Sequence, residues 1–337
     1  MPTTTDLIDP HDDAELAEWY RVWRAGSEAG RSAPLSTSLV SIGYSLRNPA
    51  MRNRHIALAA RDGGAIVGAA LLILPLRENR DMADWSIAVE PHNRGHGYGT
   101  ALLRHGMTLC EQDGRVNHVA EVDVPDDVPV DEHPGVRFAR RHGFVAKHQE
   151  DHLVLRLPVP AERLVALRSA AATHHPGYSF ASWAGACPTE FETALAELFT
   201  VMDRDVPTGE LVIEPTVWDV EMLRTAQERV MDRQMLPLIT VVRGPDGDFV
   251  GYSRMYVSYP DRANVIQDDT LVVSTHRGHR LGYELKARNL DLLADQDPEA
   301  AFVHTWNAGD NAAMQRVNER FGFTVAERMH EFQRIDR

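Results

Sequence analysis

Cysteine is nearly absent from this sequence of 337 residues, which contains only Cys110 and Cys187. The two residues lie too far apart to match the spacing of a metal-binding knuckle or of a CxxC redox motif. Such sparing use of cysteine is typical of a protein that lives in a reducing compartment. We therefore expect reduced thiols, a cytoplasmic location and no bound metal ion.

Long apolar runs are also missing, and none approaches the roughly 18 residues that a membrane-spanning helix requires. The first residues, MPTTTDLIDPHDDAE, are acidic and have no apolar stretch of the kind found in signal peptides. At 337 residues, the length favours two domains. The sequence predicts a globular protein that does not act in a membrane.

Positively charged residues are fewer than negatively charged ones, with 35 lysine and arginine residues and 49 aspartate and glutamate residues. The net charge of −14 repels nucleic acids and anionic membranes and suits a cationic substrate, although solubility alone also accounts for it. Only two of the basic residues are lysine, Lys147 and Lys286. We expect neither nucleic acid nor membrane as a partner.

What the sequence does contain is an internal duplication. The stretch RGHGYGTALL at 94–103 returns as RGHRLGYELK at 277–286. Further on, HGF at 142–144 returns as FGF at 321–323, with almost the same separation between the two copies. Two features that recur in the same order at nearly the same distance indicate two similar domains in tandem. We place them at 1–157 and 177–337, joined by a proline-containing, alanine-rich linker at 158–176.

Each half has the pattern of a mixed α/β domain. The predicted order is two helices, three mostly antiparallel strands, a helix, a strand, a helix and a last strand. In the second half a strand at 177–183 precedes these elements. Its helices are predicted at 189–203, 218–234, 281–293 and 311–320, and its other strands at 238–243, 249–257, 265–273, 301–306 and 323–332. In the first half we predict strands at 56–61, 66–74 and 86–89 and a helix at 98–110.

The glycine-rich turns have the features of an anion-binding site. In both copies a strand leads into a helix through such a turn, so the first N–H groups of the helix lack partners and point outward together. The helix dipole adds partial positive charge, and glycine lets a phosphate approach the backbone closely. Arg94 and Arg277 precede the two turns and can add charge-assisted contacts.

Two familiar phosphate-binding motifs do not fit these turns. A Walker P-loop requires GK followed by Ser or Thr, which neither copy contains. A dinucleotide fingerprint requires G-x-G-x-x-G after the first strand of a parallel sheet, whereas these turns follow antiparallel strands and have different glycine spacing.

The stretch VEPHNRGHGYG at 89–99 resembles the acetyl-CoA pyrophosphate loop of the GNAT superfamily of N-acetyltransferases. VVSTHRGHRLG at 272–282 is similar, with Arg280 in place of a glycine. The second half also carries HTWNAGDNAAMQRVNERFGF at 304–323, in which Asn307, Asn311, Met314 and the final GF follow the family pattern. The resemblance covers most of both halves and implies two tandem GNAT domains, an arrangement similar to that of mycothiol synthase.

The resemblance implies a V-shaped parting of the fourth and fifth strands, with the pantetheine arm of acetyl-CoA between them and the pyrophosphate on the turn. The fourth strands are then 84–89 and 267–273. The cofactor-binding residues that it implies are Val89, Arg94, Gly95, His96, Gly97, Tyr98, Gly99 and Thr100 in the first half, and Val272, Val273, Arg277, Gly278, His279, Arg280, Leu281, Gly282, Tyr283, Asn307 and Asn311 in the second.

For catalysis, GNAT enzymes often use a carboxylate on the fourth strand as the base. Asp268 and Asp269 occupy that strand in the second half, and alternation predicts that they face opposite sides. Asp84 is the one acid of the matching strand in the first half. The tyrosine that often protonates the thiolate is replaced by Asn318 and Ala139, which leaves the acid unassigned.

We therefore predict an acetyl-CoA-dependent N-acetyltransferase for a small-molecule amine, with catalysis in the second half and acetyl-CoA binding in the first. An acidic stretch at 202–215 is a candidate for binding a cationic acceptor, and a solvated loop explains it equally well. Two alternatives stay open: an acyl-CoA-binding regulatory protein with little turnover, and a protein-lysine acetyltransferase. Monomer and homodimer are both compatible with the sequence.

Overall fold

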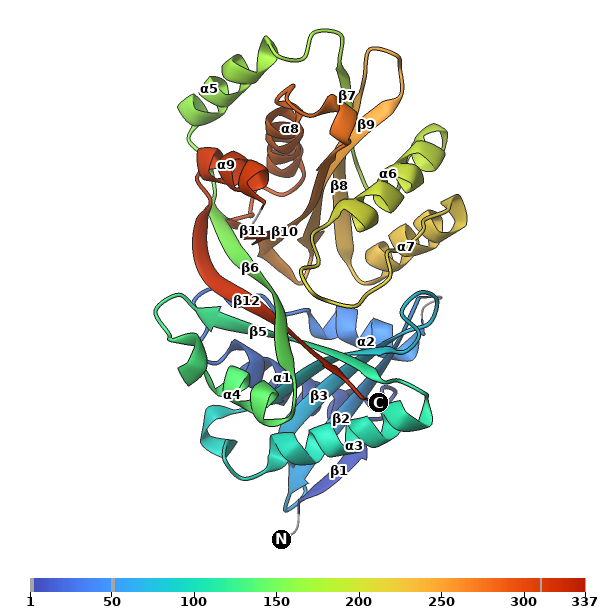
Figure 1. Ribbon diagram of the computed structural model, residues 1–337, viewed down its shortest axis with the longest axis vertical. Helices are drawn as coiled ribbons and strands as arrows, with labels where there is room; N and C mark the ends of the chain where they lie inside the picture. Colours follow the sequence, from blue (N-terminus) through green and yellow to red (C-terminus); the bar gives the residue numbers. More distant parts are fainter. Residues whose placement is uncertain (1–2, 50–51, 310, 337) are drawn as a thin grey trace. The chain divides into compact units, whose positions relative to one another are not determined.

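The computed structural model describes residues 3–49, 52–309 and 311–336. The chain divides into two compact units (Figure 1). The first unit consists of Met1–Gln149, Thr208–Glu214 and Glu327–Arg337, and the second of Glu150–Pro207 and Pro215–Ala326. Each unit contains one of the two glycine-rich turns, and each is described by itself.

The first unit is built on a mixed sheet with strand order β1-β2-β3-β4-β5-β12. Neighbouring strands among the first four are antiparallel, β5 runs parallel to β4, and β12 runs antiparallel to β5. The elements are β1 (Thr4–Leu7), α1 (Asp13–Glu28), α2 (Leu39–Arg47), β2 (Asn53–Asp62), β3 (Ala65–Pro75), β4 (Met82–Val89), α3 (Tyr98–Gln112), β5 (Asn117–Pro125), α4 (Pro134–Arg141) and β12 (Thr324–Ile335). Short 3₁₀ turns lie at Pro91–Asn93 (η1) and Val130–Glu132 (η2).

Helices cover both faces of this sheet, as the alternation of its side chains requires. On β3, Ala70 and Leu72 pack in one core with Leu102 of α3. The intervening Leu71 packs in a second core with Trp19 of α1. The chain at the end of β4 therefore enters α3 over one face, while α1 supports the other.

The second unit repeats this architecture with strand order β6-β11-β10-β9-β8-β7. Its elements are β6 (Val145–Arg156), α5 (Ala161–Ala172), β7 (Ser179–Ala184), α6 (Glu192–Asp205), α7 (Val220–Asp232), β8 (Met235–Arg243), β9 (Phe249–Ser258), β10 (Asp261–Val272), α8 (Leu281–Gln296), β11 (Phe302–Ala308) and α9 (Ala312–Phe321). Short 3₁₀ turns lie at Thr189–Phe191 (η3) and Ser274–His276 (η4). The predicted helices and strands agree with these elements to within a few residues, but β1 was not predicted.

The compact units differ from the linear division at residues 157 and 177, because the last strand of each half is exchanged. Residues 150–156 of β6 pair with β11 in the second unit. Residues 327–335 of β12 pair with β5 in the first unit. Each sheet is thus completed by a strand from the other half of the sequence, and the segment 208–214 also belongs to the first unit.

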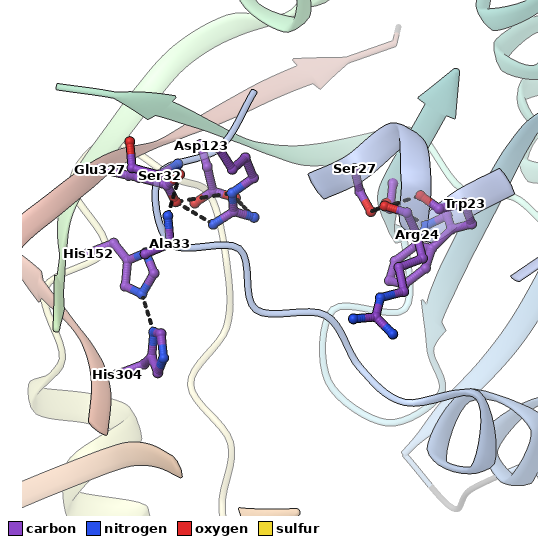
Figure 2. Close-up of polar contacts among 11 residues, drawn as sticks. Trp23, Arg24, Ser27, Ser32, Ala33, Asp123, His152, His304 and Glu327 are labelled. Carbon is purple, nitrogen blue, oxygen red and sulfur yellow. Dashed lines mark hydrogen bonds and ion pairs between the residues drawn. The ribbon is translucent and has the colours of Figure 1, made fainter. Parts of the chain in front are cut away.

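A buried ion-pair network ties β12 into the first unit. The Glu327 side chain is fully buried, and its Oε2 accepts hydrogen bonds from Arg31 Nε at 3.0 Å and Nη2 at 2.6 Å. Its Oε1 accepts from the N–H groups of Ser32 and Ala33, and Arg31 also pairs with Asp123 at 2.7 Å (Figure 2). The network fixes the loop after α1 against the strands β5 and β12.

Removing the guanidinium of Arg31 leaves a carboxylate in the protein interior without its counter-ion. We expect Arg31→Met to lower the free energy of unfolding by about 3 kcal/mol or more, measured by urea unfolding. Arg21→Met is the matched control, because Arg21 is 58% exposed where it pairs with Glu90, and its loss is expected to cost at most about 1 kcal/mol. Equal losses in the two variants would contradict this account of the network.

Candidate functional site

The glycine-rich turn of the first unit joins the end of β4 to the start of α3. The backbone turns through Gly95 at φ 84° and Gly97 at φ 91°, both in the left-handed region that favours glycine. Gly97 is the N-cap of α3 and provides no side-chain hydrogen bond to the helix. The first bond of the helix backbone runs from Ala101 N to Gly97 O at 2.9 Å. The N–H groups of residues 98–100 are therefore left for an outside acceptor.

The turn is shaped for a phosphate group. A Cβ atom added at Gly95 or Gly97 would meet nothing within 4 Å, so the space in front of the turn is open. The uncapped N–H groups and the helix dipole together favour an anion at this place. These residues fit the diphosphate of an acyl-CoA.

The turn of the second unit has the same backbone path. Gly278 has φ 90°, and Arg280 takes the left-handed N-cap position at φ 53° where the first unit has Gly97. The Arg280 guanidinium donates to the carbonyl of Ala170 at 2.7 Å, which offsets the cost of that conformation in a residue other than glycine. The helix α8 again has no side-chain cap.

The arginines that precede the two turns donate hydrogen bonds to the backbone next to their own turns. Arg94 Nε donates to Val89 O, and Arg277 Nε donates to Val272 O, both at 3.0 Å. Arg277 also pairs with Asp205 at 3.0 Å. Each guanidinium therefore spans its own turn and fixes its shape, in addition to any charge that it offers a phosphate.

Other predicted cofactor residues of the first turn lie around the start of α3. Tyr98 is buried and donates its hydroxyl to Asp62 at 2.9 Å, and its ring stacks with that of His96. Thr100 Oγ1 lies 3.2 Å from His142 Nε2. Gly99 faces Phe138, whose ring carbon would lie 3.2 Å from an added Cβ. These contacts fix the first turn of the helix.

In the second unit several predicted cofactor residues have structural partners. His279 Nδ1 lies 2.9 Å from the carbonyl of His174, so the linker contacts the turn. Asn311 is the N-cap of α9 and accepts from Met314 N, while Asn307 is buried and donates to Ala308 O. Leu281 lies in an apolar core, and Val273 N donates to Val250 O. Gly282 faces open space, and the ring of Tyr283 stacks with that of Phe321.

In both units the fourth and fifth strands part before the turn. Parallel pairing of β4 with β5 covers only Met82–Trp85 and Asn117–Ala120. Pairing of β10 with β11 covers only Asn264–Ile266 and Phe302–His304. The remaining residues of β4 and β10 continue towards the turn beyond this pairing. This is the parting that the family resemblance implies.

The prediction that Asp268 and Asp269 face opposite sides was wrong. The ladder between β10 and β9 shifts its register between Gln267 and Thr270, so strict alternation is lost at the two aspartates. Both carboxylates contact one guanidinium, that of Arg254 on β9, at 2.5 and 2.6 Å. A bulge of this kind cannot be recognised from the spacing of the residues alone.

The surroundings of the two aspartates give them different roles. Asp269 Oδ2 accepts from the hydroxyl of Tyr252 at 2.9 Å as well as from Arg254, so this oxygen already has two donors. Asp268 is more open, with 37% of its side chain exposed. Even so, burial of the site, followed by the charge of Asp269, raises the pKa of Asp268 to about 6, while Arg254 opposes the rise. Asp268 is the better placed of the two to accept a proton.

Arg254 is held firmly in the second unit. Its guanidinium lies over the ring of Phe199, 4.4 Å from the centroid, as well as against the two carboxylates. The charge of Asp203 also acts on Asp268, and its Oδ2 accepts from Trp218 Nε1 at 3.0 Å. Two carboxylates thus contact the guanidinium and a third, that of Asp203, acts on Asp268, so the cluster is negative overall and suited to a cation.

The corresponding place in the first unit lacks this arrangement. When the two glycine-rich turns are aligned in sequence, Trp85 and Ser86 stand where the second unit has the two aspartates. Ser86 Oγ accepts from Trp23 Nε1 at 3.0 Å. Asp84 lies within the paired part of β4, where burial and then Glu331 raise its pKa to about 7. The first unit therefore has a complete turn but no counterpart of the two aspartates on its fourth strand.

The acidic stretch at 202–215 is largely engaged by the protein. Asp205 pairs with Arg277, and Glu210 pairs with Lys147 at 3.1 Å. Glu214 exchanges backbone hydrogen bonds with Asn79. Of the four acids of this stretch, Asp203 is the one that acts on the aspartates of β10.

Comparisons with known proteins agree with this geometry. Residues 16–144 match the model of the acetyltransferase (GNAT) family. The chain is 27% identical over 323 residues to a mycothiol acetyltransferase of Sanguibacter keddieii, covering 94% of this chain and 92% of the relative. A tandem GNAT protein from the clavulanic acid biosynthesis pathway is similar in structure, with a TM-score of 0.81, 24% identity and coverage of 99% and 98% of the two chains. A GCN5-related N-acetyltransferase from Sphaerobacter thermophilus has a TM-score of 0.65 at 15% identity, with coverage of 99% and 95%.

The fold is therefore that of a tandem GNAT protein, in which both units have the same mixed sheet and turn. Residues 16–144 carry the match to the acetyltransferase (GNAT) family, and the relative that aligns over 94% of the chain is an acetyltransferase. Members of this family use an acyl-CoA donor. In the part of the chain that the structure describes, no helix is long and apolar enough to cross a membrane, and no group of three metal-binding side chains occurs.

The raised pKa of Asp268 predicts a specific pH dependence for a reaction in which this residue is the base. Asp268 can accept a proton only when it is ionised, so kcat/KM is expected to fall about tenfold per pH unit below pH 6. Asp268→Asn should lower kcat/KM by about 10²-fold or more and remove this acidic limb.

Asp269→Asn is the matched control in this experiment. It changes the neighbouring carboxylate, which is already held by Tyr252 and Arg254, and should keep the acidic limb. An acidic limb that survives in Asp268→Asn but disappears in Asp269→Asn would reverse the two roles.

Proposed function

We propose that the second unit transfers an acetyl group from acetyl-CoA to the primary amine of a small molecule. The observation that carries this proposal is the position of Asp268, beyond the last residue of β10 that pairs with β11 and on the stretch of the strand that leads to the Gly278 turn. A base at this place lies between a donor bound along the parted strands and solvent. The first unit, with its turn but without the carboxylates, is proposed to bind acetyl-CoA with little or no catalysis.

The residues of the second unit support the steps of acyl transfer to an amine. An amine enters mostly as its ammonium ion and must lose a proton before it attacks. The net negative charge of Asp203, Asp268 and Asp269 around Arg254 attracts that cation. Asp268 can then take the proton, directly or through water, because its pKa lies near the physiological range. Arg254 keeps the carboxylate in place.

The acyl-CoA supplies an activated thioester when it is bound, and the chain supplies its binding surface. The uncapped N–H groups at the starts of α3 and α8 would hold the diphosphate. Backbone groups of β10 beyond Ile266, where β11 has parted from it, are available to an extended amide-containing arm. Because these features are repeated, we propose that the two halves, 1–157 and 177–337, are two acetyl-CoA-binding domains.

A small acceptor is supported by the mycothiol acetyltransferase relative, whose alignment extends over nearly the whole chain. The distribution of charge favours a cationic amine, and the cytoplasm is the compartment that we propose. The protein-lysine acetyltransferase and the non-catalytic regulatory protein have no specific observation in their favour beyond the shared fold.

Binding of acetyl-CoA can be assigned to each unit by calorimetry. We expect two sites in the intact protein, one lost in Gly97→Glu and the other in Gly282→Glu, because each variant places bulk and negative charge in one turn. Transferase activity, assayed with a panel of small amines, should disappear only with Gly282→Glu.

Gly97→Arg is the control for strain at a left-handed position. The second unit tolerates an arginine at the equivalent Arg280, so this variant changes bulk without adding negative charge, and it should keep more affinity than Gly97→Glu. Loss of activity with Gly97→Glu alone would place catalysis in the first unit and contradict the proposal.

A further inference from the structure

Two core positions differ in polarity between the two units. When the two glycine-rich turns are aligned in sequence, Leu103 on α3 corresponds to Lys286 on α8. When the two GF dipeptides are aligned, Ala139 on α4 corresponds to Asn318 on α9. Leu103 and Ala139 are buried in one apolar core of the first unit. The second unit has thus replaced two apolar residues with a charged and a polar one.

Asn318 carries a buried amide without a partner. Only 1% of the residue is exposed, and neither Nδ2 nor Oδ1 has a hydrogen-bond partner among the described residues. Leaving such a group unsatisfied costs about 1–3 kcal/mol per donor or acceptor. The cost points to a ligand that supplies the missing partner.

Lys286 carries a buried ammonium without a counter-ion. The residue is 3% exposed, and within the described chain no hydrogen bond or ion pair is recorded for its Nζ, which lies 5.5 Å from the centroid of the Phe323 ring. Burial alone lowers the pKa of Lys286 to about 7. Apart from Lys147 and Lys286, all residues counted as lysine or arginine are arginine. Arginine cannot give up its proton in a protein, whereas lysine can.

One residue, Phe323, contacts both Lys286 and the backbone of Asn318. Phe323 connects them, because its ring lies under Lys286 and its N–H donates to the backbone carbonyl of Asn318 at 3.1 Å. Helix α8 follows β10 and α9 follows β11, so the two residues come from the helices that continue the parted pair. The family resemblance implies that the pantetheine arm of a donor on the Gly278 turn lies between these two strands.

We propose that Lys286 and Asn318 form the leaving-group site of the second unit, in which Lys286 donates a proton to the departing sulfur and the Asn318 amide donates it a hydrogen bond. This inference rests on the function proposed for the second unit. The amine nitrogen forms a bond to the acyl carbon, the carbon–sulfur bond breaks, and the sulfur leaves with its electron pair and receives the Lys286 proton. The amine nitrogen gives up two protons in all, one to Asp268 before the attack and one to solvent as the amide forms. Asp268 then releases its proton to solvent, and Lys286 regains from solvent the proton that it gave to the sulfur.

The first test measures the thiol of bound CoA and requires no turnover. Gly97→Glu serves as the background so that CoA occupies only the second unit, and the pKa of the bound thiol is read from thiolate absorbance. An adjacent ammonium stabilises a thiolate, so we expect this pKa to be lower by about 1–3 with Lys286 present than in Lys286→Leu. Lys286→Leu and Asn318→Ala introduce the residues of the first unit, and circular dichroism verifies that they fold.

The second test uses turnover with Gly97 intact. In the native protein we expect kcat to decline above pH 7, where Lys286 loses its proton; Lys286→Leu should lower kcat by about 10²-fold and remove this decline. Lys286→Arg separates charge from proton donation, because it should keep the thiol pKa low while kcat stays reduced. Asn318→Ala should lower kcat with little effect on the affinity for acetyl-CoA.

The outcomes separate this inference from the proposed function. An unchanged thiol pKa in Lys286→Leu, with CoA still bound, would overturn the leaving-group site whether or not the protein is active. Activity that persists with the same pH profile in Lys286→Leu would also overturn it while leaving the transferase intact. If the thiol pKa is lower with Lys286 than in Lys286→Leu but the native protein shows no turnover, the result would support the site and refute the proposed function. Failure of CoA to bind in the Gly97→Glu background would overturn both.

Discussion

The parting of the fourth and fifth strands is the constraint on which both candidate sites depend. Parallel pairing ends at Trp85 in the first unit and at Ile266 in the second, although β4 and β10 continue for several residues. An unpaired strand edge inside a domain is costly unless another group satisfies its backbone. The glycine-rich turn follows at once, with uncapped N–H groups at the start of a helix. A single extended ligand with an anionic end satisfies both features together.

The two units share this framework but differ in what they place along it. In the second unit a bulge in β10 turns two aspartates onto Arg254, and α8 and α9 contribute a buried ammonium and amide. In the first unit the corresponding positions hold apolar residues and a serine that is bonded to Trp23. A duplicated fold can keep the binding of a shared cosubstrate in both copies while only one copy keeps the groups for chemistry. The asymmetry of these few residues is the basis for assigning catalysis to the second unit.

Much of the fold could be predicted from the sequence, because the signals were local. The duplicated turn, the hairpins and the amphipathic helices follow from glycine spacing and periodicity, and the family resemblance implied the parting of the strands. The exchange of β6 and β12 between the units could not be predicted, since the sequence of each strand is compatible with either sheet. The bulge at Asp268 was missed because alternation assumes a regular ladder, and Arg254 was missed because its role depends on a neighbouring strand. The scarcity of lysine in the sequence made Lys286 unusual, but the sequence alone did not show that this residue is buried.

The account rests most directly on the N–H groups of the two turns as the binding site of the diphosphate. Amide hydrogen exchange, measured with and without acetyl-CoA, reports on these groups residue by residue. The account predicts slower exchange at residues 95–100 and 278–283 on addition of acetyl-CoA, with the protection in each turn abolished by its own glycine-to-glutamate variant. Unchanged exchange in both turns at saturating acetyl-CoA, with protection elsewhere in the chain, would contradict it.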